Sequence, residues 1–183
     1  MLQVIIALAV ICFLVFPSQT PIGKVQITES DCWNKNGNVQ RLACNQIIAS
    51  NLLHGRPIEK SDLAIILSNR GTGYAEYGQF EKVIADYTKA VQLNPEGSHF
   101  FFNRANTFRD LGKFDLAIED YNKAIQTNPR HSAAYSNRGL TFQQNGQREK
   151  AIRDYFKALE IDPSLKQAKE NLISLGIKGK REV

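Results

Sequence analysis

Hydrophobic positions between residues 64 and 165 follow one pattern three times. In the second half of each copy, apolar side chains recur at intervals of three or four residues, which indicates one buried face of a helix. These side chains are Val83, Ile84, Tyr87, Ala90 and Val91 in the first copy, Ala117, Ile118, Tyr121, Ala124 and Ile125 in the second, and Ala151, Ile152, Tyr155, Ala158 and Leu159 in the third. Each copy is therefore predicted to contain an amphipathic helix.

Polar residues mark the same repeat. An Asn-Arg pair, an Asp-Tyr pair and an Asn-Pro or Asp-Pro pair recur at steps of 34 residues, with no insertion or deletion between copies. The pairs are Asn69-Arg70, Asn103-Arg104 and Asn137-Arg138, then Asp86-Tyr87, Asp120-Tyr121 and Asp154-Tyr155, and finally Asn94-Pro95, Asn128-Pro129 and Asp162-Pro163. A fixed period of this size is typical of a stacked array in which each unit packs against its neighbours.

Glycine and proline divide each copy into two helices. Gly78, Gly112 and Gly146 stand at equivalent places, and glycine readily adopts the left-handed conformation that ends a helix. A proline then closes each copy, because proline cannot continue the preceding helix. The sequence therefore predicts two antiparallel helices per copy.

This pattern resembles the tetratricopeptide repeat over about 100 of the 183 residues. The resemblance rests on large, small and aromatic residues at fixed places in the first helix of each copy, and on the closing prolines. The large residues are Leu67, Phe101 and Tyr135, the small ones are Gly71, Ala105 and Gly139, and the aromatic ones are Tyr74, Phe108 and Phe142. One departure is Arg148, because the other copies have Phe80 and Phe114 at that place.

The resemblance implies an all-α fold, an α-solenoid of antiparallel helix pairs. Three repeats are expected at residues 64–97, 98–131 and 132–165, within an array that covers residues 61–165. A capping helix and a basic tail are expected at residues 166–183, because the last repeat has no neighbour to cover it.

The chain begins with an apolar run from Leu2 to Phe16. The run is short for a helix that must span about 30 Å of hydrocarbon, and it resembles the apolar core of a secretory signal. Residues 1–20 are therefore interpreted as a signal peptide or an N-terminal membrane anchor, the only expected contact with a membrane. Either interpretation predicts an extracytoplasmic location, in the periplasm or secreted, by analogy with bacterial envelope proteins.

Residues 21–60 are expected to form a partial helical repeat that contains Cys32, Trp33 and Cys44. In an oxidising compartment the two cysteines would form a disulfide, and otherwise they would be two buried thiols. Trp33 is expected to pack in the interior. No metal site is expected, because the two cysteines lack nearby partner ligands.

Composition adds little to this picture. The net charge is +5 and charged residues make up 22% of the chain, a mild balance that permits an acidic partner without requiring one. Most aromatic residues fall at core positions of the repeat, so no nucleic-acid partner is expected. The sequence has no catalytic or phosphate-loop motif. It therefore predicts neither an enzyme nor a cofactor.

Arginine and aspartate recur together, with one member of each pair on each helix of its copy. The pairs are Arg70 with Asp86, Arg104 with Asp120 and Arg138 with Asp154, each separated by 16 residues. The fork of an arginine side chain suits a carboxylate. We expect ion pairs between the helices, with a structural role that fixes register more than it adds stability.

Asn69, Asn103 and Asn137 form a second periodic set on the first helices. In the family those helices line the concave surface, and a side-chain amide can donate to and accept from the backbone of an extended peptide. The alternative, that the amides bond to neighbouring helices, carries equal weight. The same face is expected to present His99, Phe102, Asn106, Arg109, Leu140 and Gln143.

One variant of the family grips a terminal carboxylate with such asparagines and with lysines one helical turn earlier. This chain has Ile65, His99 and Ala133 at the lysine places, so that mechanism is not expected. The sequence predicts a non-catalytic adaptor or scaffold that binds a protein or peptide outside the cytoplasm. The alternatives are a structural subunit that self-associates and an accessory subunit of an envelope enzyme complex, and the oligomeric state stays open.

Overall fold

The computed structural model describes residues 28–34 and 37–177. Residues 1–20, interpreted as a signal peptide or anchor, and residues 178–183 of the basic tail lie outside the described residues. In chain order the elements are the 3-10 helix η1 (Glu29–Cys32), α1 (Gly37–Ser50), β1 (Leu52–Leu53), β2 (Arg56–Pro57), α2 (Lys60–Ala75), α3 (Phe80–Leu93), α4 (Ser98–Asp110), α5 (Phe114–Thr127), α6 (Ser132–Gln144), α7 (Arg148–Ile161) and α8 (Lys166–Ser174).

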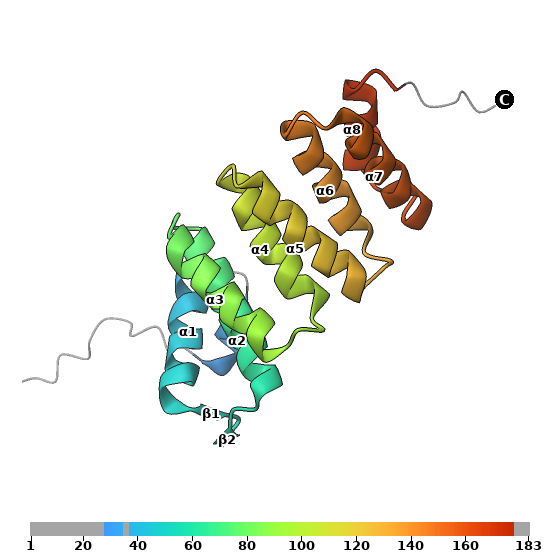
Figure 1. Ribbon diagram of the computed structural model, residues 1–183. Helices are drawn as coiled ribbons and strands as arrows, with labels where there is room; N and C mark the ends of the chain where they lie inside the picture. The colour runs from blue at the N-terminus through green and yellow to red at the C-terminus, as the bar shows by residue number, and fades with distance from the viewer. Residues whose placement is uncertain (1–27, 35–36, 178–183) are drawn as a thin grey trace, which may run out of the picture.

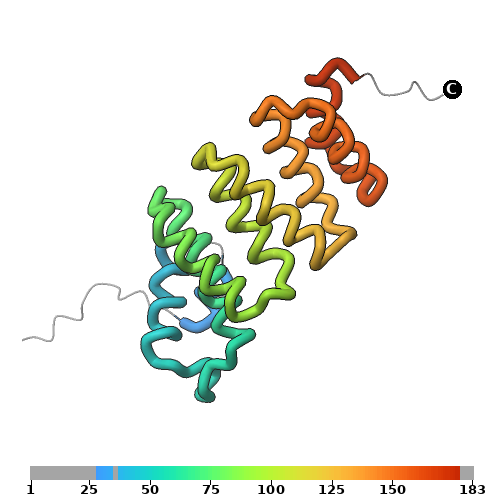
Figure 2. The backbone as a smooth tube through the Cα atoms, in the orientation of Figure 1, coloured from blue at the N-terminus to red at the C-terminus, as the bar shows by residue number. Residues whose placement is uncertain are grey.

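The helices lie in sequence order along one axis, with α1 near one end and α8 at the other (Figures 1 and 2). The pairs α2 with α3, α4 with α5 and α6 with α7 pack closely, and the second helix of each pair also packs on the next pair. Short loops make the two helices of a pair antiparallel. The expected all-α solenoid of three helix pairs and a capping helix is confirmed.

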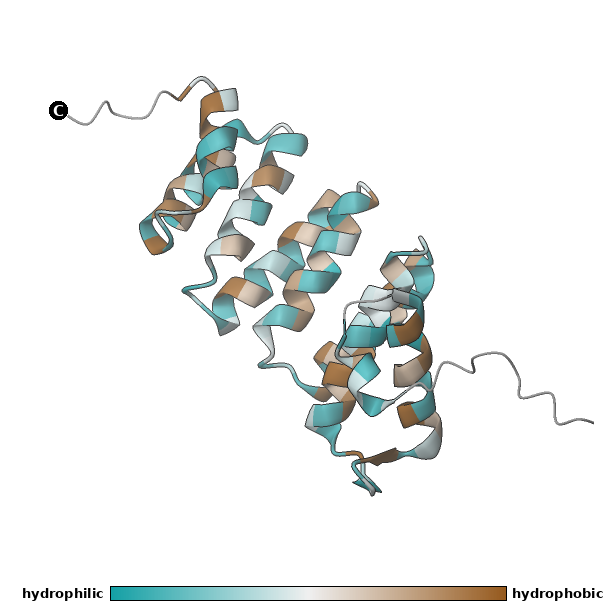
Figure 3. Ribbon diagram, turned by 180° about the vertical axis from the view of Figure 1, so that it is seen from behind, coloured by the Kyte–Doolittle hydropathy of each residue, from teal (hydrophilic) through white to brown (hydrophobic). Residues whose placement is uncertain are grey.

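The helices of a pair approach closely where a small residue faces a tyrosine. A Cβ atom added to Gly71 would lie 3.1 Å from Tyr87 Cε1, and one added to Gly139 would lie 2.9 Å from Tyr155 Cε1. The tyrosines are buried, so the small residues leave the space that the rings fill. Figure 3 shows apolar and polar residues alternating along the helices, as amphipathic segments require.

The three glycines after the first helices have positive φ angles, which stop these helices. Gly78, Gly112 and Gly146 have φ angles of 65°, 70° and 73°. The next residue then bonds back to the helix, and in the middle repeat Lys113 N donates to Phe108 O at 2.8 Å. This arrangement satisfies carbonyl groups that the end of a helix leaves free.

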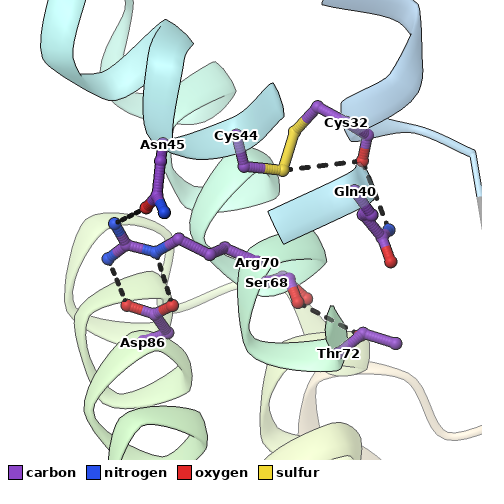
Figure 4. The surroundings of a disulfide bond; sticks show 8 residues. All are labelled: Cys32, Gln40, Cys44, Asn45, Ser68, Arg70, Thr72 and Asp86. Atoms are coloured by element: carbon purple, nitrogen blue, oxygen red, sulfur yellow. Dashed lines mark hydrogen bonds and ion pairs between the residues drawn. A yellow bond between two sulfur atoms is a disulfide. The ribbon is translucent and has the colours of Figure 1, made fainter. Parts of the chain in front are cut away.

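A disulfide joins η1 to α1 in the N-terminal module. The sulfur atoms of Cys32 and Cys44 are 2.08 Å apart, and their Cα atoms are 4.9 Å apart (Figure 4). Both residues are fully buried, and they pack with Ile47, Leu53 and Ile66. The module therefore has its own apolar core, and Ile66 on α2, the first helix of the first repeat, completes it.

Two features of this module differ from expectation. Trp33 is 43% exposed, so the expectation of an interior position is wrong. Trp33 follows the last residue of η1, and its backbone N–H caps that helix on Ser30 O at 3.1 Å while its side chain faces solvent. Beyond α1, β1 pairs with β2 in an antiparallel hairpin, because His54 and Gly55 adopt the positive φ angles of a tight hairpin turn.

At the other end, α8 covers the last repeat. Ala168 and Leu172 are buried against it, and Arg148 Nη2 donates to Leu175 O at 2.6 Å. The arginine that departs from the family pattern thus ties α7 to the end of α8. Within residues 28–34 and 37–177, none of the helices is both long enough and apolar enough for a membrane span.

Candidate functional site

The predicted site belongs to the first helices α2, α4 and α6, whose shared side we call the first-helix face. Helix α4 contacts α6, and α6 contacts α8, in addition to the contacts within each pair. Successive first helices therefore follow one another along one side of the array. Side chains from neighbouring repeats can meet there.

The arginine and aspartate pairs lie between the helices of each repeat. Each arginine uses its Nε and Nη2 atoms to donate to both oxygens of its aspartate. The Nε and Nη2 distances are 2.8 and 2.6 Å for Arg70 with Asp86, 2.7 and 2.8 Å for Arg104 with Asp120, and 2.7 and 2.7 Å for Arg138 with Asp154. These hydrogen bonds to Asp86 raise the pKa of Arg70 above its ordinary value, because they outweigh burial, which acts in the opposite direction.

Each of these arginines also reaches the preceding second helix. Its Nη1 atom donates to a residue at the same place in that helix. The acceptors are Asn45 for Arg70 at 3.0 Å (Figure 4), Thr88 for Arg104 at 3.0 Å and Asn122 for Arg138 at 2.6 Å. One guanidinium therefore joins the two helices of its own repeat to the second helix that precedes them. This arrangement gives the arginine and aspartate pairs a structural role.

A polar network crosses from the second repeat to the third on the first-helix face. Tyr121 Oη donates to Asn106 Oδ1, and Asn137 Nδ2 donates to the same oxygen at 2.9 Å. Arg109 Nη1 lies 3.5 Å from Tyr121 Oη, and Arg109 Nη2 donates to Asp110 Oδ1 at 2.8 Å. Burial is the main reason why the pKa of Tyr121 is raised to about 12, so its hydroxyl stays a donor at neutral pH.

Aromatic rings lie beside this network. The Phe102 ring centroid is 4.8 Å from that of His131, and the His99 centroid is 3.8 Å from that of Phe100. Partial burial lowers the pKa of both histidines, and the positive charge that His99 carries once it is protonated lowers the pKa of His131 further. Both imidazoles are therefore neutral at pH 7, and this part of the face is aromatic and uncharged.

The remaining predicted residues are placed less closely together. Gln143 Oε1 accepts from Tyr155 Oη at 2.8 Å, and Leu140 is half-buried on α6. Asn69 and Asn103 are also half-buried, and their side-chain amides make no hydrogen bond to the rest of the described chain. The three asparagines thus differ, since Asn137 bonds to a neighbouring helix while the other two amides stay available.

His131 and Thr72 were missed by sequence reasoning. His131 precedes α6 and stacks on Phe102, and Thr72 Oγ1 lies 3.1 Å from Tyr87 Oη. The period contains a signal for Thr72, because it stands 34 residues before Asn106 and likewise pairs with the tyrosine of its own repeat. No comparable signal marks His131, which lies in a loop between repeats.

The described residues offer little for metal or acid-base chemistry. Across residues 28–34 and 37–177, no group of three or more His, Cys, Asp or Glu side chains is placed to hold a metal ion. Several polar groups of the first-helix face pair with one another, among them Asn106 with Asn137 and Tyr121. What the arrangement provides is hydrogen-bonding and aromatic surface.

Comparison with known proteins agrees with this geometry. Residues 105–146 match the family described as TPR repeat, and residues 132–165 match the Tetratricopeptide repeat. None of the curated proteins matches the chain. The helix pairs, the 34-residue period and these matches make the chain a member of the tetratricopeptide-repeat family.

Solved structures of the family are similar to this chain. The first TPR of Spaghetti (RPAP3), bound to the HSP90 peptide SRMEEVD, is 31% identical, with a TM-score of 0.62 over 63% of this chain and 92% of that one. The second TPR domain of human RPAP3, in complex with the HSP70 peptide SGPTIEEVD, is 27% identical, with a TM-score of 0.62 over 66% and 100%. The Arabidopsis OM64 TPR domain is 26% identical, with a TM-score of 0.63 over 64% and 98%.

Proposed function

We propose that this protein is a non-catalytic adaptor that binds a peptide segment of another protein on its first-helix face, outside the cytoplasm. The observation that carries the proposal is the middle of that face. There Phe102 lies against His131, and Asn106 lies against Asn137, so aromatic surface and amide groups are adjacent. Aromatic side chains are enriched at protein interfaces, and amides can bond to a peptide backbone.

The relatives support the choice of a peptide as ligand. Two RPAP3 domains of the same fold are bound to peptides from HSP90 and HSP70. In this chain Ile65, His99 and Ala133 occupy the places where a terminal carboxylate would meet lysines. We therefore propose an internal segment of the partner rather than its C-terminus.

The two available amides favour recognition that tolerates different peptide sequences. Asn69 and Asn103 offer both donors and acceptors, and a peptide backbone presents the same groups whatever its sequence. Affinity from such contacts is modest. We expect a dissociation constant of about 1 μM, which corresponds to about −8 kcal/mol.

The proposed location has two supports. The apolar run from Leu2 to Phe16 is of a kind that directs export. The Cys32–Cys44 disulfide joins two fully buried residues, and disulfides persist in oxidising compartments. Protease treatment of spheroplasts tests the location, since an exported protein is digested there and a cytoplasmic protein is protected.

Affinity capture from an envelope extract tests the binding function. The full chain is used as bait beside a Phe102→Ala, Asn103→Ala variant, and a Glu119→Ala variant on the exposed side of α5 is the control. We expect specific proteins that wild type and control capture equally and the double variant captures at least fivefold less. Equal capture by all three baits would contradict a first-helix site.

A further inference from the structure

A shallow pocket of about 340 Å³ lies between α5, α6 and α7. Its walls come from all three helices and include none of the residues predicted for the first-helix face. The lining residues are Ile118, Asn122, Arg138, Phe142, Lys150, Arg153 and Asp154. This pocket is therefore a separate feature of the third repeat.

The pocket is positively charged. Both oxygens of Asp154 are bonded to Arg138, so these two charges offset each other. Across residues 28–34 and 37–177, neither Lys150 nor Arg153 has a carboxylate within the 4.0 Å of an ion pair. Two uncompensated positive charges thus border one small space.

Other groups hold the lysine in place and supply further donors. Lys150 Nζ donates to Gln147 Oε1 at 2.6 Å and lies 5.3 Å from the centre of the Phe142 ring. Asn122 Oδ1 accepts from Arg138 at 2.6 Å, which leaves its NH₂ group free to donate. The pocket therefore combines cationic and neutral donors with the apolar side chains of Ile118 and Phe142.

One of the two free cations, Arg153, breaks the 34-residue period. Arg153 corresponds to Ala85 in the first repeat and to Glu119 in the second, whereas the rest of the lining largely repeats. Lys150 corresponds to Leu116 in the second repeat but to Lys82 in the first, where Lys82 Nζ likewise donates to Gln79 Oε1 at 2.9 Å. Ile84, Arg104, Phe108 and Asp120 are the equivalents of Ile118, Arg138, Phe142 and Asp154. The repeated local contacts therefore account for the lysine, whereas neither other repeat has a cation at the place of Arg153, so the packing of the repeat does not account for that arginine.

We propose that the pocket binds a small organic phosphate monoester, with its phosphate between Lys150 and Arg153 and its organic group on Ile118 and Phe142. A phosphate monoester carries about −1.5 to −2 charges at pH 7, which matches two cations, while a carboxylate carries one. The arginine fork also suits phosphate oxygens. This site does not depend on the proposed binding of a peptide elsewhere.

Calorimetric titration of the full chain tests the site, with phenyl phosphate as the probe and benzoate as its singly charged analogue. We expect one phenyl phosphate per chain, bound at least tenfold more tightly than benzoate. Lys150→Gln with Arg153→Gln should weaken phenyl phosphate at least tenfold. Both side chains are exposed, so circular dichroism should show an intact fold. The control, Lys89→Gln with Arg130→Gln, loses the same charge from exposed places elsewhere and should stay within twofold.

A gain of function gives a second test. Leu116→Lys with Glu119→Arg places the two cations in the second repeat, and the number of bound phenyl phosphates should rise from one to two. The proposal is overturned if the Lys150 and Arg153 variant binds like wild type, or if benzoate binds as tightly as phenyl phosphate. It is also overturned if vesicles with phosphatidic acid bind while phenyl phosphate does not.

Discussion

Arg104 and Asp120 meet across the two helices of the middle repeat through hydrogen bonds of 2.7 and 2.8 Å. The side chain of Arg104 is 17% exposed and that of Asp120 is 6% exposed, so both charges are largely removed from water. The third bond of Arg104, to Thr88 on α3, connects this pair to the repeat before it. The arginine therefore sets the position of three helices at once.

Removal of the carboxylate should be costly. Asp120→Ala leaves Arg104 without its counter-charge, and loss of one partner of a buried pair lowers the free energy of unfolding by roughly 3–5 kcal/mol. Urea denaturation measures this change. Asp115→Ala, at an exposed place on the same helix, is the control and should cost well under about 1 kcal/mol. Similar losses in the two variants would show that the pair does not stabilise the array.

The disulfide should stabilise the N-terminal module. Cys32 and Cys44 are separated by 12 residues in sequence. In the chain-entropy model, a closed loop of this size reduces the conformational entropy of the unfolded chain and so raises its free energy by roughly 3 kcal/mol. Replacement of both by serine should lower the free energy of unfolding by about that amount. Mass spectrometry after alkylation of protein from its native compartment checks the bond itself. Free alkylation of both residues without reductant would argue against it.

The free energy of unfolding should decrease as the pH is lowered, because of two histidines on the first-helix face. The folded state lowers the pKa of His99 and His131, mainly through burial, so the unfolded chain takes up their protons first. Their contribution is complete above the ordinary pKa of 6.5 and is lost as pH falls through the lowered values. His99→Gln with His131→Gln should flatten the stability curve between about pH 7 and 5. An equal slope in the wild type and in the double variant would refute this explanation.

Asn103 and Asn137 should behave differently on substitution. Asn137→Ala removes the hydrogen bond to Asn106 and should lower stability by about 1 kcal/mol. Asn103 has no such side-chain bond in the described chain, so Asn103→Ala should leave the thermal midpoint unchanged and weaken partner binding by about 1 kcal/mol. Thermal unfolding and titration with the captured partner measure the two effects. If Asn103→Ala destabilises the protein and its folded fraction binds normally, the amide is structural.

The period accounts for most of what the sequence predicts about the fold. A residue that must face its equivalent in every repeat, such as Arg104 opposite Asp120, is visible as a recurrent pair at one spacing. Cys44 is also visible, because it stands as far from the start of α1 as Tyr87 stands from the start of α3. Such positions are determined by helix geometry, which the sequence encodes locally.

The parts that the sequence left open or predicted wrongly depend on features that occur only once in the chain. The bond between Asn137 and Asn106 arises because only the second repeat has asparagine at that place, where the others have Thr72 and Leu140. The exposure of Trp33 follows from the end of a short 3-10 helix, which apolar character alone does not reveal. Neither feature repeats, so the period gives no information about them.

Site-specific photo-crosslinking in the native organism tests most directly whether the first-helix face binds a protein. A photoreactive phenylalanine analogue replaces Phe102 in one variant and Leu116, which is 45% exposed on α5, in another. We expect a discrete adduct with a second protein from position 102, at least fivefold weaker when Asn103→Ala is also present, and little adduct from position 116. Adducts from position 116 alone, or equal adducts from both positions, would contradict a partner on the first-helix face.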